Sequence, residues 1–100
     1  MKILLTCAAG MSTSLMVEKM KKAAAERGLD ATIKAESVDK FVDLVTEYDV
    51  VLLGPQVRYK LAEFKKIGAE NNVPVEVIDS VAYGMVNGGK VLDQAIELIG

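Results

Sequence analysis

Apolar residues in this 100-residue chain fall into short continuous runs that alternate with stretches of helical spacing. Four runs have the length of strands, at residues 2–6, 31–36, 49–53 and 75–78. The first and third are apolar almost throughout, which is typical of parallel strands covered on both faces. Residues 31–36 alternate instead, which predicts a less buried strand.

Between these runs, apolar residues recur every three or four positions and predict helices. The first helix is expected from Ser12 to about Arg27, with Gly28 ending it. A short amphipathic helix is expected after an N-cap at Ser37, a longer one before Asn71 and a brief one after Asp79. A last helix is expected near the C-terminus. The apolar faces are predicted at Met16 and Met20, at Val38, Phe41, Val42 and Val45, at Val57, Leu61, Phe64 and Ile67, and at Val91, Leu92, Ala95, Ile96 and Ile99.

Strands that alternate with helices predict a doubly wound α/β fold with a parallel sheet. We expect one flavodoxin-like domain, residues 1–100, with four strands in the order 2-1-3-4 and helices on both faces. Such folds bind ligands beyond the carboxyl ends of the strands, where the strand order reverses. That crevice would bring Cys7 beside Gly54, Pro55 and Gln56, with Asp79 one strand further along.

Composition excludes several classes of function. The net charge is −2, from 12 basic and 14 acidic residues, so nothing indicates binding to nucleic acid. The chain has one cysteine and no histidine, which excludes an internal disulfide, a Cys–His zinc site and Cys–His catalysis within the chain. No apolar run approaches the length of a membrane span or of a signal peptide's core. We expect a protein of the reducing cytoplasm, with no metal and no cofactor.

The one cysteine stands at the start of a segment suited to binding an anion. Residues Cys7 to Ser14 read Cys-Ala-Ala-Gly-Met-Ser-Thr-Ser, between a buried strand and a helix N-terminus. Backbone amides without helical partners converge at such a point, and the positive helix end favours a thiolate. Two interpretations remain from position alone: a nucleophile in a phosphate-binding segment, or a buried structural cysteine at a strand end.

The residues that follow Cys7 exclude three familiar chemistries. A cysteine-dependent phosphatase needs an arginine six positions after the cysteine, where this chain has Thr13. A thioredoxin-like site needs a second cysteine, and a Walker loop needs a lysine before its hydroxyl residue. The remaining chemistry is a cysteine that accepts a phosphoryl group and keeps it until a partner arrives.

The chain closely resembles the IIB component of the bacterial sugar phosphotransferase system, in the lactose/cellobiose (diacetylchitobiose) class. The resemblance covers essentially all 100 residues and rests on three segments in the same order. These segments are Cys7-Ala8-Ala9-Gly10-Met11-Ser12-Thr13-Ser14, Val50-Val51-Leu52-Leu53-Gly54-Pro55-Gln56, and Val75-Glu76-Val77-Ile78-Asp79-Ser80 with Tyr83-Gly84.

The resemblance implies a phosphotransferase of the phosphoenolpyruvate-dependent system. Family members take phosphate from a phosphohistidine on component IIA, carry it on the cysteine that matches Cys7, and pass it to a sugar on the membrane component IIC. The sugar would be a β-linked disaccharide such as cellobiose, chitobiose or lactose. The phosphate would be held by Ala8, Ala9, Gly10, Met11, Ser12, Thr13 and Ser14.

Partner contacts are expected around this segment. We expect IIA to contact Met11, Leu15 and part of residues 54–59, in particular Gly54, Pro55, Gln56 and Tyr59. The alternative for Leu15 is a place in the core. Asp79 and Tyr83 are expected beside the site.

The competing function is a non-enzymatic flavodoxin-like module that binds a small phosphorylated ligand. A receiver domain is disfavoured, because no paired acidic residues follow the first strand to hold magnesium.

Overall fold

The computed structural model describes residues 1–7 and 11–100, with the side chains of Met11 and Ser12 left out of the description. The strands are β1 (Lys2–Cys7), β2 (Thr32–Ser37), β3 (Val50–Leu53) and β4 (Val75–Val77). The α-helices are α1 (Met11–Glu26), α2 (Phe41–Leu44), α3 (Leu61–Glu70), α4 (Ser80–Gly84) and α5 (Gly88–Ile99). Three 3-10 segments accompany them: η1 (Val38–Lys40), η2 (Val45–Glu47) and η3 (Pro55–Lys60).

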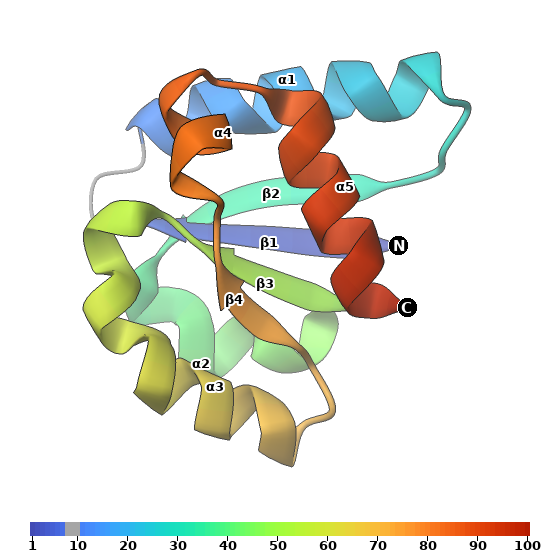
Figure 1. Cartoon of the computed structure of the whole chain (residues 1–100). Coiled ribbons are helices and arrows are strands. Elements are labelled where there is room, and N and C mark those ends of the chain that lie inside the picture. The colour runs from blue at the N-terminus through green and yellow to red at the C-terminus, as the bar shows by residue number, and fades with distance from the viewer. Residues whose placement is uncertain (8–10) are drawn as a thin grey trace.

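The four strands form one parallel sheet in the order β2-β1-β3-β4, which confirms the predicted topology (Figure 1). β1 is central, and Leu4 pairs with Lys34 on one side and with Val51 on the other. All four residues of β3 are buried, as their uninterrupted apolar character predicts. The carboxyl ends of the strands therefore meet at one edge of the sheet.

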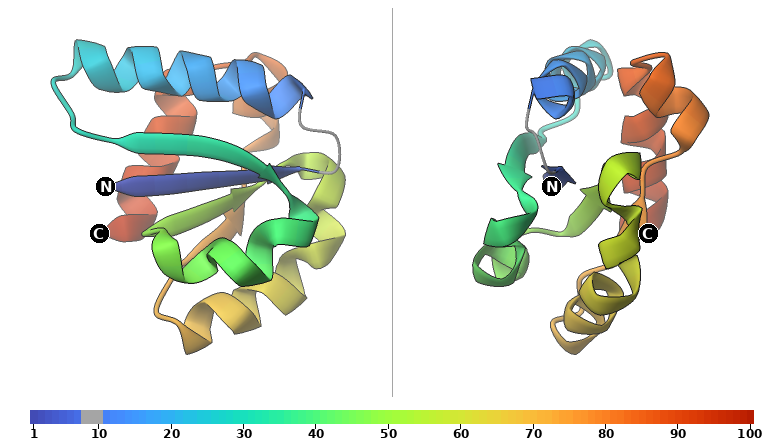
Figure 2. Two further views of the ribbon diagram at one scale, coloured as in Figure 1. Left: turned by 180° about the vertical axis from the view of Figure 1, so that it is seen from behind. Right: turned by 90° about the vertical axis from the view of Figure 1, so that its left-hand side faces the viewer.

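Helices cover both faces of the sheet, as predicted. Figure 2 shows α1, α4 and α5 on one face and α2 and α3 on the other. Ile3 and Leu5 of β1 pack with α1 and α5, whereas Leu4 packs with Phe41 and Phe64 on the opposite face. Because side chains alternate along a strand, Cys7 lies on the α1/α5 face and Thr6 on the α2/α3 face.

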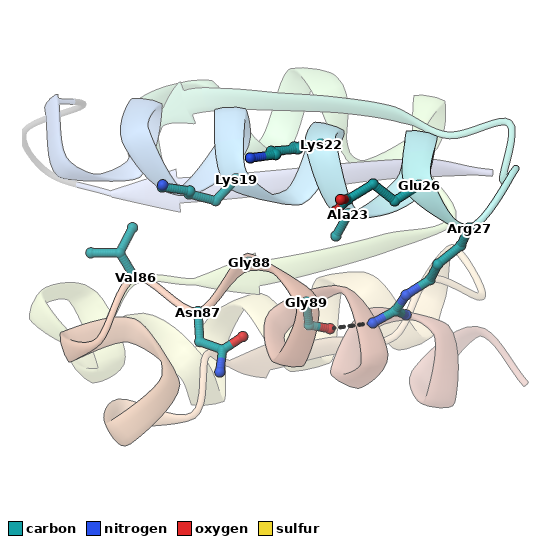
Figure 3. A pocket seen from close by; sticks show the side chains of 9 residues that line it. All are labelled: Lys19, Lys22, Ala23, Glu26, Arg27, Val86, Asn87, Gly88 and Gly89. Atoms are coloured by element: carbon teal, nitrogen blue, oxygen red, sulfur yellow. Dashed lines mark hydrogen bonds between the residues drawn. The ribbon is translucent and has the colours of Figure 1, made fainter.

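α1 and α5 approach each other closely at Gly88. A Cβ atom on Gly88 would overlap the carbonyl carbon of Lys19, so only glycine fits against the backbone of α1. Arg27 reaches from the end of α1 to Asp93, and its Nη2 donates to the carbonyl of Gly89 at 3.2 Å (Figure 3). These contacts fix the two helices that cover the Cys7 face.

Three element predictions need correction. The expected amphipathic helix after Ser37 is broken into η1, α2 and η2, and Val42 is 60% exposed where it was predicted to be buried. The third helix begins with a 3-10 segment at Pro55, because Val57 leaves helical geometry there. In the last helix, Ile99 is the final helical residue and is 38% exposed, although it was predicted on the apolar face.

Other boundary signals act as predicted. Ser37 is the N-cap of η1 and its side chain accepts from the Asp39 amide at 3.2 Å. Gly28 has a φ of +66° after α1, the left-handed conformation that glycine adopts most readily. Asp79 is the N-cap of α4.

Candidate active site

Cys7 is the last residue of β1, placed at the carboxyl edge of the sheet. It pairs in register with Ser37 of β2 on one side. On the other side the Gly54 amide donates to the carbonyl of Thr6 at 2.8 Å, which brings Gly54 beside Cys7. The cysteine residue is 2% exposed. Sequence reasoning predicted this position between the first and third strands, at the crevice of the fold.

The N-terminus of α1 follows Cys7 after three residues, 8–10. The predicted phosphate-binding residues Ala8, Ala9 and Gly10 lie outside the described residues, as do the side chains of Met11 and Ser12. A connection of three residues keeps the first turn of α1 near the strand end. The helix end supplies about half a positive charge and amides without helical partners, an environment that favours an anion.

Thr13 lies in this first turn of α1 and is fully buried. Its hydroxyl has no hydrogen-bond partner among the residues that the structure describes. A buried hydroxyl without a partner is costly, so its presence in a native structure calls for an explanation. Ser14, by contrast, is exposed and lines a shallow hollow between α1 and β2 together with Glu18, Lys34 and Glu36.

The wall of the site on the β3 side is formed around Gly54. A Cβ atom on Gly54 would lie 3.0 Å from Oε1 of Gln56 and 3.6 Å from Cβ of Cys7. The Gln56 amide therefore occupies the space that a side chain at position 54 would fill. Nε2 of Gln56 donates to the hydroxyl of Tyr83 at 3.2 Å, which links η3 to α4 across this wall.

Asp79 acts here as a helix cap. Its carboxylate accepts from the Ala82 amide at 2.9 Å, and its own amide donates to Oε1 of Gln94 at 3.0 Å. Gln94 also donates to the carbonyl of Val77 at 2.8 Å. These contacts hold α4 against α5 and so fix the position of Tyr83.

A cavity of about 580 Å³ opens beside the Gln56–Tyr83 contact. Its lining residues come from η3 and α4: Pro55, Gln56, Arg58, Tyr59, Ser80, Tyr83 and Gly84. Another cavity, of about 380 Å³, lies between α1 and α5 near Gly88 and includes none of the predicted site residues (Figure 3).

Exposed apolar side chains surround the carboxyl edge of the sheet. Leu15 is 52% exposed, so it is not a core residue, and Tyr59 is 72% exposed. Sequence reasoning missed Val81 and Met85 of the α4 region, which are 68% and 72% exposed. The available signal was that residues 81–86 are almost all apolar, more than one face of a short helix can bury.

Two further observations concern the described ranges, 1–7 and 11–100. They contain no group of three or more acidic or cysteine side chains that could hold a metal ion. They also contain no helix with the length and apolar character needed to cross a membrane.

Comparison with known proteins gives the family. The family model "PTS system, Lactose/Cellobiose specific IIB subunit" matches residues 2–94. The oligo-beta-mannoside-specific EIIB component of Bacillus subtilis is 46% identical over 98% of this chain and 95% of its own length. The lactose-specific EIICB component of Lacticaseibacillus casei is 26% identical over 97% of this chain, which spans 16% of that longer protein.

Two solved structures share the architecture. The cellobiose-specific phosphotransferase IIB component protein of Borrelia burgdorferi has a TM-score of 0.82 and 40% identity, over 99% of this chain and 91% of the other. The lactose-specific IIB component domain of Streptococcus pneumoniae has a TM-score of 0.88 over 98% of this chain and 96% of the other. Its sequence identity is 19%, so this similarity supports the fold alone. The chain therefore belongs to the lactose/cellobiose-specific IIB family of the sugar phosphotransferase system, whose members are phosphotransferases.

Proposed function

We propose that this protein carries a phosphoryl group on Cys7, between a phosphohistidine of component IIA and a sugar bound by the membrane component IIC. The proposed carrier is one domain, residues 1–100, that acts in the cytoplasm. The observation that carries the proposal is the position of Cys7 at the carboxyl edge of β1, before the N-terminus of α1. The N-terminus of α1 offers amides without helical partners and about half a positive charge, both of which suit a phosphoryl group carried on the sulfur.

The proposed transfer consists of two displacements at phosphorus. The sulfur of Cys7 attacks the phosphohistidine, so that an S–P bond forms as the N–P bond breaks. The imidazole leaves with the electron pair and takes up the thiol proton. In the second displacement a sugar hydroxyl attacks phosphorus, the S–P bond breaks, and sulfur regains its electron pair while the hydroxyl proton restores the thiol.

We assign the retention of the phosphate to residues 8–14. Their amides and hydroxyls would hold the phosphoryl oxygens, as charge-assisted hydrogen bonds do at helix N-termini. The buried hydroxyl of Thr13, which has no partner in the described part of the chain, supports this role because a phosphate would supply one. No arginine lies within residues 8–14, so hydrolysis lacks the charged group that phosphatases use.

We propose that IIA docks over the carboxyl edge of the sheet. The contacts would come from Met11, Leu15, Gly54, Pro55, Gln56 and Tyr59. The exposure of Leu15 and Tyr59 supports this face, since large apolar side chains in water are typical of interaction sites. The EIICB name of a relative supports the partnership with IIC. The sugar class that we propose is a β-linked disaccharide such as cellobiose, chitobiose or lactose, in line with the family description.

The test is a phosphorylation assay read by intact mass. The protein is incubated with phosphoenolpyruvate, the general phosphotransfer proteins and IIA, and compared with Cys7→Ser. We expect one added phosphoryl group on the wild type, located at Cys7, and none on the variant. Sugar phosphorylation by membranes that contain IIC should also disappear in the variant, because a serine hydroxyl is a much weaker nucleophile.

Two results would contradict the proposal. One is sugar phosphorylation by a correctly folded Cys7→Ser variant at the wild-type rate. The other is a wild type that gains no covalent phosphate but binds a small phosphorylated ligand, which would indicate the binding module instead.

A further inference from the structure

We propose that Gln56 contacts the phosphoryl group on Cys7 and that its side-chain amide rotates on phosphorylation, so that Nε2 and Oε1 exchange places. The hydroxyl of Tyr83 is the hydrogen-bond partner of the Gln56 amide in both orientations. The inference rests on the proposed phosphocysteine and adds a role that the partner contact assigned to Gln56 does not include. Two features of the Gln56 side chain support it. Oε1 lies close to the position that a Cβ atom on Gly54 would take, and Nε2 donates to the Tyr83 hydroxyl.

The first contact places the amide next to Cys7. Oε1 of Gln56 lies 3.0 Å, and Cβ of Cys7 3.6 Å, from the position that a Gly54 Cβ would take. Gly54 follows Leu53, which pairs with Thr6, so that this position belongs to the same sheet face as the Cys7 side chain. Tyr83 packs against the core cluster of that face, which contains Ile3 and Leu5. The amide thus lies between the cysteine and α4.

The orientation of the amide suits an unphosphorylated cysteine. Nε2 points to Tyr83, so the carbonyl oxygen is the end directed to the space beside Cys7. A carbonyl oxygen can accept a hydrogen bond from a thiol. The same oxygen would repel a thiolate or the oxygens of a phosphoryl group.

Rotation of the terminal amide removes this conflict. The NH2 group would then face the phosphoryl oxygens and donate a charge-assisted hydrogen bond, and Oε1 would face Tyr83. A tyrosine hydroxyl accepts from an amide NH2 and donates equally well to an amide oxygen. The Gln56–Tyr83 contact therefore survives in both states, and no polar atom of the amide loses its partner.

Nuclear magnetic resonance provides the direct test. The side-chain NH2 signals of Gln56, assigned by their absence in Gln56→Leu, are compared in the unphosphorylated and phosphorylated wild type. We expect one NH2 proton to move downfield on phosphorylation, as a charge-assisted hydrogen bond requires. Tyr83→Phe should reduce this shift, whereas Tyr48→Phe should leave it unchanged, because Tyr48 precedes β3 at the opposite edge of the sheet.

The equilibrium with IIA gives a second readout. Gln56→Leu removes the donor and should move the phosphoryl group back toward IIA about tenfold or more. Gln56→Glu places a negative charge on a side chain of nearly the same shape. It should shift the equilibrium toward IIA further than Gln56→Leu does. A purely structural role predicts the reverse order, because glutamate keeps the bond to Tyr83 and leucine does not.

The outcomes separate this inference from the proposed function. If Cys7 of the wild type takes up no phosphate, both fail. If Cys7 is phosphorylated while the Gln56 signals do not move, or if Gln56→Leu keeps the wild-type equilibrium with IIA, the amide rotation is wrong and the carrier function stands.

Discussion

Two threonine hydroxyls are fully buried without a hydrogen-bond partner among the described residues, one on each face of the sheet. Thr13 lies in α1, beside the proposed phosphate site, and Thr6 faces the α2/α3 side of β1. Their surroundings differ in one respect that matters for function. A phosphate on Cys7 would give Thr13 a partner, whereas Thr6 is on the wrong face of β1 to reach it.

This pair allows a matched experiment. We expect Thr13→Val to reduce the share of phosphorylated protein at equilibrium with IIA about tenfold or more, since a hydrogen bond to a charged group contributes about 1.5–3 kcal/mol. Thr6→Val should leave transfer unchanged. Both variants should unfold at slightly higher urea concentration than the wild type, because each removes a buried hydroxyl with no partner and keeps the side-chain shape. Equal transfer by the two variants would contradict the role of Thr13.

Tyr48 gives the chain a specific sensitivity to alkaline pH. Burial, followed by the negative charges of Glu36 and Glu47, raises the pKa of Tyr48 above its usual value of 10.0. The folded protein therefore binds the phenolic proton more tightly than the unfolded chain. This contribution to stability is fully present below pH 10 and is lost as the pH rises through the folded-state pKa.

The prediction compares the wild type with Tyr48→Phe. The free energy of unfolding, measured with urea at pH 8 and again above pH 10, should fall more steeply for the wild type than for the variant, which has no phenol at position 48. All other ionisable groups are the same in the two proteins, so their effect cancels in the difference. Parallel curves for the two proteins would show that Tyr48 does not titrate differently in the folded state.

At the scale of the elements, the apolar runs predicted the strands and their order correctly. The strand order follows from four buried runs and the crossovers between them, because few right-handed arrangements exist. The broken helix after Ser37 could not be predicted, since α2 is only four residues long and its packing depends on Phe64 from a distant helix. Phe41 stacks on Phe64 with 3.9 Å between ring centroids, and Val42 is turned outward as a result.

The close approach of α1 and α5 has a testable consequence. Gly88→Ala should lower the free energy of unfolding by about 1–3 kcal/mol, because the new Cβ would overlap the backbone of Lys19, which cannot move aside as a side chain does. Gly89→Ala is the matched control. Its Cβ would first meet the guanidinium of Arg27 at 3.4 Å, the end of a flexible side chain. This variant should be neutral or stabilised by less than about 1 kcal/mol, since alanine favours helix more than glycine does.

At the scale of the whole molecule, the carboxyl edge of the sheet gathers parts that are far apart in sequence. The beginning of α1, the η3 segment and α4 meet there, at the left of Figure 1 and toward the viewer in the right-hand view of Figure 2. The position of Cys7 beside Gly54 could be predicted, because parallel strands end at the same edge. The contact of Gln56 with Tyr83 could not, since it depends on side-chain directions that periodicity does not encode.

The same edge presents the exposed apolar residues Leu15, Tyr59, Val81 and Met85, which we expect to be covered when IIA docks. A charge at the centre of such an interface has to lose its water without gaining a partner, so Met85→Glu and Leu15→Glu should each weaken phosphoryl transfer from IIA about tenfold or more. Val42→Glu is the control, because Val42 is exposed to a similar degree, at 60%, but lies on α2 across the sheet. Initial rates at low IIA concentration measure the effect. Saturating IIA should restore the rate of both variants, since docking is weakened while Cys7 and its surroundings are intact. If Val42→Glu slows transfer as much as Met85→Glu does, the docking face lies elsewhere on the molecule.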